Sequence, residues 1–98
     1  MKAKSRKKTD DRREQARSEI AIQIGKAARE ARLKLKLTQA DVAERVNLVA
    51  EVYGKIERGV MLPSAPTLIK LRTALGVTAD YLMGLANDVQ PEGSQAPQ

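Results

Sequence analysis

A run of capping and turn residues between positions 37 and 59 constrains the fold of this chain more than any other feature. Thr38 and Asp41 have the spacing of a capping box, in which two side chains satisfy the first backbone amides of a helix. Asn47 tolerates the left-handed backbone conformation that ends a helix, and Gly59 adopts it without steric penalty. The segment therefore predicts two short helices joined by a tight turn.

The apolar residues of this segment give each of the two helices one buried face. The second helix is expected from about Val49 to Arg58. The predicted inward residues are Val42, Ala43 and Val46 in the first helix and Tyr53 and Ile56 in the second. A helix, a short turn and a second helix form the unit that places its second helix in the major groove of DNA.

Helical patterns also precede and follow this unit. An amphipathic helix is predicted before it, with Ile20, Ile24, Ala27, Ala28, Ala31 and Leu35 inward and Lys26, Arg29, Glu30, Arg32 and Lys34 on a charged outer face. After it, Ser64 caps a helix that Gly76 ends, and Thr78 caps a last short helix. The inner face of the helix after Ser64 is predicted to contain Leu68, Leu71, Ala74 and Leu75.

Composition agrees with one small all-helical domain. The 98 residues are 42% apolar but only 2% aromatic, so the core must be aliphatic, which suits helices better than sheets. Neither cysteine nor histidine occurs, which removes disulfides, thiolate metal ligands, a cysteine nucleophile and the usual general base. We therefore expect neither an enzyme nor a metal or other cofactor. Without a secretory or membrane-spanning apolar run, a cytoplasmic protein with no membrane partner is expected.

Positive charge is concentrated at the N-terminus. Residues 1–36 contain 13 basic and 5 acidic residues, whereas residues 37–98 contain 5 basic and 7 acidic ones. Such asymmetry favours a polyanionic partner. Residues 1–17 are predicted to form a basic arm, flexible or partly helical, because good helix formers begin at Asp10. Its basic residues are Lys2, Lys4, Arg6, Lys7, Lys8, Arg12, Arg13 and Arg17.

The arm has two interpretations, which are compatible. It is either a solvated, disordered tail or an arm that follows DNA phosphates or enters a minor groove. Residues 86–98 have two prolines, one glycine and no apolar periodicity, so a disordered C-terminal tail is expected there.

Three motifs in order resemble the helix-turn-helix family of phage repressors and Cro proteins, which includes small bacterial regulators of the xenobiotic-response-element type. They are LTQ-x-x-x-A from Leu37, IERG ending at Gly59, and ALGV-x-x-D-x-L from Ala74. The resemblance covers residues 20–85, about two thirds of the chain. It implies an all-α, five-helix lambda-repressor-like DNA-binding domain over residues 18–85, with the helix-turn-helix at helices 2 and 3, and double-stranded DNA as the partner.

In such a domain the outward residues of the third helix would read bases. With Tyr53 and Ile56 inward, the outward residues are Ala50, Glu51, Gly54 and Lys55, with Val52 at the margin. Lys55 suits guanine, Glu51 suits cytosine, and Ala50 and Val52 suit a thymine methyl group. Gly54 is expected to let the helix approach DNA closely. Many family members have Ser or Thr where Val49 stands, and Gln, Arg or Ser at the first reading positions.

Phosphate contacts are expected at the edges of the unit. The resemblance implies that Lys36 lies near the sugar-phosphate backbone and that Gln39 reaches a phosphate or braces a side chain of the recognition helix. Arg58, next to Gly59, is also placed for a phosphate.

The functional interpretation is a sequence-specific transcriptional regulator, a repressor that also controls its own gene, in a bacterial or phage nucleoid. The resemblance implies a homodimer, and the candidate dimer residues are Tyr81, Leu82, Met83 and Leu85. Two alternatives on the same fold stay open. One is an antitoxin or adaptor that binds a protein partner, and the other is the controller protein of a restriction-modification operon.

Overall fold

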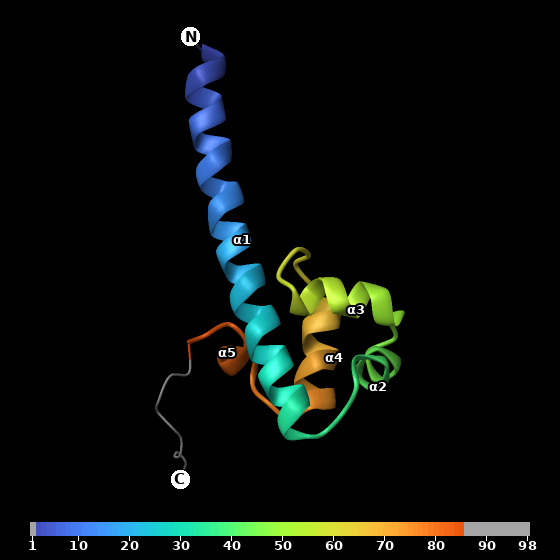
Figure 1. Cartoon of the computed structure of the whole chain (residues 1–98). Helices are drawn as coiled ribbons and strands as arrows, with labels where there is room; N and C mark the ends of the chain where they lie inside the picture. The colour runs from blue at the N-terminus through green and yellow to red at the C-terminus, as the bar shows by residue number, and fades with distance from the viewer. Residues whose placement is uncertain (1, 86–98) are drawn as a thin grey trace.

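The computed structural model describes the backbone of residues 2–85 and the side chains of residues 11–85 (Figure 1). It contains the five helices α1 (Lys2–Lys34), α2 (Gln39–Arg45), α3 (Ala50–Glu57), α4 (Ala65–Leu75) and α5 (Ala79–Leu82). No strand occurs within residues 2–85, so the prediction of an all-α fold with five helices is confirmed. The C-terminal tail predicted for residues 86–98 lies outside the described residues.

The first helix is much longer than the sequence pattern suggested. α1 is continuous over 33 residues, and its N-terminal half stands clear of the other four helices (Figure 1). Residues 11–20 are all exposed. The helix continues because residues 2–24 contain neither glycine nor proline and are rich in Lys, Arg, Glu and Ala. The backbone of the predicted arm is thus helical from Lys2, well beyond the one or two turns expected.

The helix ends follow the capping signals of the sequence. Thr38 Oγ1 accepts a hydrogen bond from the Asp41 amide at 3.0 Å, and Asp41 Oδ2 accepts one from the Thr38 amide at 2.9 Å. Asn47 has a left-handed backbone with φ of 64°, and Gly59 has φ of 77°. The capping roles predicted for Ser64 and Thr78 and the left-handed Gly76 are also present. The capping-box prediction is confirmed.

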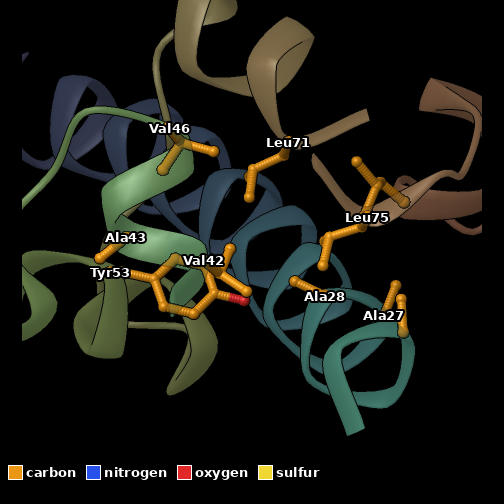
Figure 2. Packing of buried hydrophobic residues seen from close by; sticks show 10 residues of the cluster. Ala27, Ala28, Val42, Ala43, Val46, Tyr53, Leu71 and Leu75 are labelled. Carbon is orange, nitrogen blue, oxygen red and sulfur yellow. The ribbon is translucent and has the colours of Figure 1, made fainter. Parts of the chain in front are cut away.

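The core lies between α1, α2 and α4 and is closed by one residue each from α3 and α5. Figure 2 shows the labelled side chains of the first four helices gathered between them. The buried cluster consists of Ala27, Ala28, Ala31, Val42, Ala43, Val46, Tyr53, Leu71, Leu75 and Leu82. The three alanines on α1 allow the other helices to pack closely against its backbone. All of the residues predicted to face inward in the helix-turn-helix unit are buried, so that prediction is confirmed.

Four side chains lie elsewhere than the sequence pattern predicted. Ile20 and Leu35 were expected in the core but are 46% and 48% exposed, because one lies in the early part of α1 and the other follows its last residue. Arg32 was expected on the solvated face of α1 but is buried. Leu82 was expected in an exposed dimer patch but is fully buried in the core.

Candidate nucleic-acid interface

α3 lies on the surface with one face packed inward and the other facing solvent. Its inward face is anchored by Tyr53 and Ile56, which are 0% and 1% exposed. Ala50, Glu51 and Lys55 are exposed, as expected for outward residues. Val52 is half-buried, which agrees with its predicted place at the margin.

Gly54 does not belong to this outer face. It is buried, and a Cβ atom at this position would lie 3.3 Å from both Arg58 Nη1 and Gln39 Oε1. The absence of a side chain therefore makes room for two neighbouring side chains of the same molecule. The prediction that Gly54 is an outward residue is wrong, while the close approach of α3 to DNA stays a prediction.

α3 is held against α1 by direct backbone contact. A Cβ atom on Gly25 would overlap the carbonyl oxygens of Ile56 and Glu57. A Cβ atom on Gly59 would lie 2.9 Å from Ile22 Cα. Glycine at these two positions lets the C-terminal end of α3 sit on the backbone of α1.

A buried ion pair fixes the same end of α3. Arg32 donates to Glu57 through Nε at 2.6 Å and through Nη2 at 3.1 Å. Arg32 Nη1 also donates to the Leu37 carbonyl at 2.9 Å, and Gln39 Nε2 donates to Glu57 Oε1 at 2.9 Å. Glu57, the last residue of α3, is thereby bonded to α1 and to the start of α2. Arg32 extends the network to the loop between α1 and α2.

The ion pair was missed at the sequence level. Glu57 stood within the IERG motif without a role, and Arg32 was assigned to solvent. A signal was present, because Arg32 follows the buried Ala28 by four residues and Glu57 follows the buried Tyr53 by four residues. Two opposite charges next to buried positions on neighbouring helices indicate a paired interaction.

The surroundings of the pair determine its protonation. Burial acts to raise the pKa of Glu57. The hydrogen bonds from Arg32, the nearby Tyr53 hydroxyl, the hydrogen bond from Gln39 and the charge of Arg32 together lower the pKa by more than burial raises it. The hydrogen bond to Glu57 raises the pKa of Arg32. Glu57 is therefore a carboxylate, and the link between α1 and α3 is ionic at neutral pH.

The phenol of Tyr53 lies in the core beside the Arg32–Glu57 pair. Its oxygen has no partner within the part of the chain that the structure describes. Burial raises the pKa of Tyr53, so the side chain is neutral.

The three residues predicted to bind phosphate lie around the helix ends. Gln39 is the first residue of α2 and is half-buried, and its amide nitrogen binds Glu57. Arg58 is the exposed C-cap of α3, and its guanidinium, like the Gln39 side chain, lies close to Gly54. Lys36 is exposed between α1 and α2, with φ of 60°. The geometry shows Gln39 in the bracing role, while the three phosphate contacts stay predictions.

The remaining predicted residues are spread over the two ends of the molecule. Arg12 and Arg13 are exposed on the projecting part of α1. The residues Lys2, Lys4, Arg6, Lys7 and Lys8 lie on the same helix, with side chains outside the described ones. In the predicted dimer patch, Tyr81 and Met83 are half-buried and Leu85 is exposed. Within residues 2–85, no helix combines the length and the apolar character needed to span a bilayer.

Curated relatives of the chain include regulators and bridging factors. It is 36% identical over 63 residues to the HTH-type transcriptional regulator ImmR of Bacillus subtilis, an alignment covering 64% of this chain and 50% of ImmR. It is 40% identical over 58 residues to multiprotein-bridging factor 1 of Candida albicans, covering 59% of this chain and 38% of that protein. The chain thus spans half or less of the length of these two relatives.

Solved structures with the same fold include two regulators. The restriction-modification controller protein C.AhdI from Aeromonas hydrophila superposes with a TM-score of 0.60 at 31% identity, covering 63% of this chain and 94% of C.AhdI. The clp gene regulator ClgR from C. glutamicum gives a TM-score of 0.62 at 23% identity, covering 67% of this chain and 86% of ClgR, and shares the fold. Residues 29–82, more than half of the chain, match the helix-turn-helix family profile. The chain belongs to the helix-turn-helix family, whose two-helix unit is α2 and α3.

Proposed function

We propose that this protein is a sequence-specific DNA-binding transcriptional regulator that places α3 in the major groove of double-stranded DNA. The observation that carries the proposal is the outer face of α3. Ala50, Glu51 and Lys55 are exposed on a helix whose other face is locked by Tyr53, Ile56 and the Arg32–Glu57 pair. A rigid helix with a free outer face is what base readout requires. The HTH-type regulators among its relatives support the same function.

Base readout is assigned to four residues. Lys55 would donate to guanine O6 and N7, and Glu51 would accept from cytosine N4. Ala50 and the exposed part of Val52 would meet thymine methyl groups. Gly54 is removed from this set, because it is covered by Gln39 and Arg58.

Phosphate binding is assigned to the rim of α3 and to the projecting helix. Lys36 and Arg58 are exposed cations that flank the helix-turn-helix unit, Lys36 before α2 and Arg58 after α3. Gln39 would hold Glu57 in place and contribute its remaining polar atoms to a phosphate. The basic residues of the first 17 positions would add affinity that does not depend on base sequence, since phosphate contacts position a protein without reading bases.

A dimer on a two-fold symmetric operator is the proposed assembly. Two copies would read half-sites about one helical turn apart. Leu82 is excluded from the interface by its burial, which leaves Tyr81, Met83 and Leu85 at the C-terminal end of the domain. The regulator would act as an autoregulatory repressor in the cytoplasm, at the nucleoid. Control of a restriction-modification operon, the role in C.AhdI's name, is one form of this function.

A second function, as an adaptor or antitoxin that binds a protein, is favoured by one surface. The exposed residues Ile22, Val60, Met61 and Leu62 line a groove of about 470 Å³ between α1 and the loop after α3. The likeness to multiprotein-bridging factor 1 supports this second function.

The test is direct DNA binding by the full chain. Duplexes from the region upstream of its own gene and random duplexes are titrated at two salt concentrations. A specific regulator binds one upstream duplex more tightly than random DNA at both concentrations, with affinity falling as salt rises. Equal binding to both duplexes would refute sequence-specific regulation and favour the adaptor function.

A further inference from the structure

Val49 is an exposed apolar side chain at the start of the proposed reading helix. It is the N-cap of α3, and its side chain is 65% exposed. Its backbone carbonyl accepts the first helical hydrogen bonds, from Val52 and Tyr53, each at 3.1 Å. The backbone position is thus fixed while the isopropyl group points away from the core.

Neither of the usual structural reasons accounts for valine at this position. N-cap residues normally supply a side-chain oxygen to the first amides of the helix, and valine has none. Thr38, Ser64 and Thr78 do so at the starts of α2, α4 and α5. Burial is also no reason, because most of the side chain is in solvent.

The neighbours of Val49 make the start of α3 an apolar end of the reading face. Ala50 is exposed next to it, and Val52 is half-buried one turn along. Of the charged readers, Glu51 lies between Ala50 and Val52 in the first turn, and Lys55 lies one turn farther along the helix. Residues at the N-terminal end of a recognition helix are those that meet base edges in the major groove. The apolar group that base edges present in that groove is the C5-methyl group of thymine.

We propose that Val49 is a specificity-determining residue that packs against the C5-methyl group of a thymine in the operator half-site. The inference rests on the proposed function, since it requires α3 to lie in the major groove. It assigns an A·T pair, with a fixed strand orientation, to the position read by the start of α3. Removing one buried methyl group should weaken binding about fourfold.

Uracil provides the matched probe, because it differs from thymine only by lacking the C5-methyl group. The full chain is first used to select its preferred duplex from a random pool. Each thymine of one half-site is then replaced singly by uracil, and the dissociation constant is measured for each duplex. For the wild-type chain, at least one uracil substitution should weaken binding about fourfold.

Two variants and one control assign the effect to Val49. Val49→Ala should bind the thymine duplex more weakly and lose the difference between thymine and uracil at that position. Val49→Ser removes the same methyl groups but restores a capping hydroxyl, so its weaker binding cannot come from fraying of α3. Ile69→Ala, which truncates an apolar side chain that is 59% exposed on α4, should keep the full difference.

The outcomes separate this inference from the function on which it rests. If a preferred duplex is selected but every uracil substitution is neutral, or if Val49→Ala keeps the difference, Val49 does not read a methyl group while the proposed function stands. If no preferred duplex is selected, both the proposed function and the inference fail.

Discussion

Arg32 of α1 and Glu57 of α3 form a two-point ion pair across 25 residues of sequence, with nitrogen–oxygen distances of 2.6 and 3.1 Å. Glu57 is the last residue of α3 and also accepts from Gln39, the first residue of α2. The pair therefore fixes the C-terminal end of α3 against α1. Through this pair, α1 is bonded to the helix that carries the side chains assigned to base readout.

Replacing Glu57 with Gln should lower the free energy of unfolding by about 3 kcal/mol at pH 7, because Arg32 keeps its charge and loses its partner in a buried site. The exposed Glu44→Gln on α2 is the control and should change stability little. Urea denaturation measures both.

The same pair predicts a pH dependence. The pKa of Glu57 is lowered in the folded state from its ordinary value of 4.5. Its stabilisation is therefore fully present above the ordinary value and is lost as pH falls from there through the folded-state pKa. The wild-type chain should lose more stability than Glu57→Gln over this acidic range. Parallel stability curves for the two proteins would show that Glu57 is not specifically stabilised as a carboxylate.

Two glycine-to-alanine substitutions should have opposite effects. Gly25→Ala forces a methyl group against backbone carbonyls of α3 and should lower stability by about 3 kcal/mol. Gly54→Ala displaces only the ends of the Gln39 and Arg58 side chains and gains helix propensity, so it should raise stability by up to about 1 kcal/mol. Thermal or urea unfolding compares them. A larger loss for Gly54→Ala than for Gly25→Ala would mean that α3 is not seated on α1 in this way.

Tyr53→Phe should raise the free energy of unfolding by about 1 kcal/mol, because it removes a buried hydroxyl that has no partner in the described structure. Tyr53→Ala, in contrast, should cost about 4 kcal/mol through the cavity that it leaves in the core. Urea denaturation distinguishes the two. A clear loss of stability in Tyr53→Phe would indicate that the hydroxyl is hydrogen-bonded in solution.

Removing residues 1–17 should weaken binding to every duplex and flatten its salt dependence. The slope of log affinity against log salt should decrease by about 0.9 for each phosphate that the arm no longer neutralises. Arg12→Gln with Arg13→Gln should produce part of this effect, and Gln15→Ala on the same exposed stretch should produce none. Unchanged affinity and slope without these residues would mean that the helix projects away from DNA.

The sequence was informative wherever a local rule applied. Thr38, Asp41, Asn47 and Gly76 act through their own backbone neighbours, so their spacing was enough to predict the ends of the helices. The helical spacing of apolar residues likewise predicted the burial of Tyr53. These features depend on contacts within a few residues.

The features that were missed depend on contacts between distant segments. The burial of Arg32 follows only from the nearness of Glu57, and periodicity on α1 treats an arginine as solvated. Gly54 lies on the outer half of a helical wheel, but side chains from α2 and from the end of α3 cover it. Leu82 was assigned to an interface because the family resemblance implies a dimer contact at this end, and its four-residue helix is too short to show which side is buried. The reach of α1 was underestimated because a highly charged helix without an apolar face resembles a tail.

The central claim, that the outer face of α3 reads bases, is tested most directly with Lys55→Ala on the duplex that the wild-type chain prefers. The control is Lys70→Ala, which removes an exposed lysine from α4 and so has the same net charge as Lys55→Ala. The account predicts that Lys55→Ala weakens binding to the preferred duplex by at least about fivefold while binding to random DNA changes little. The Lys70 variant should retain the preference of the wild-type chain. Equal losses on both duplexes, or equal effects of the two variants, would contradict base readout by α3.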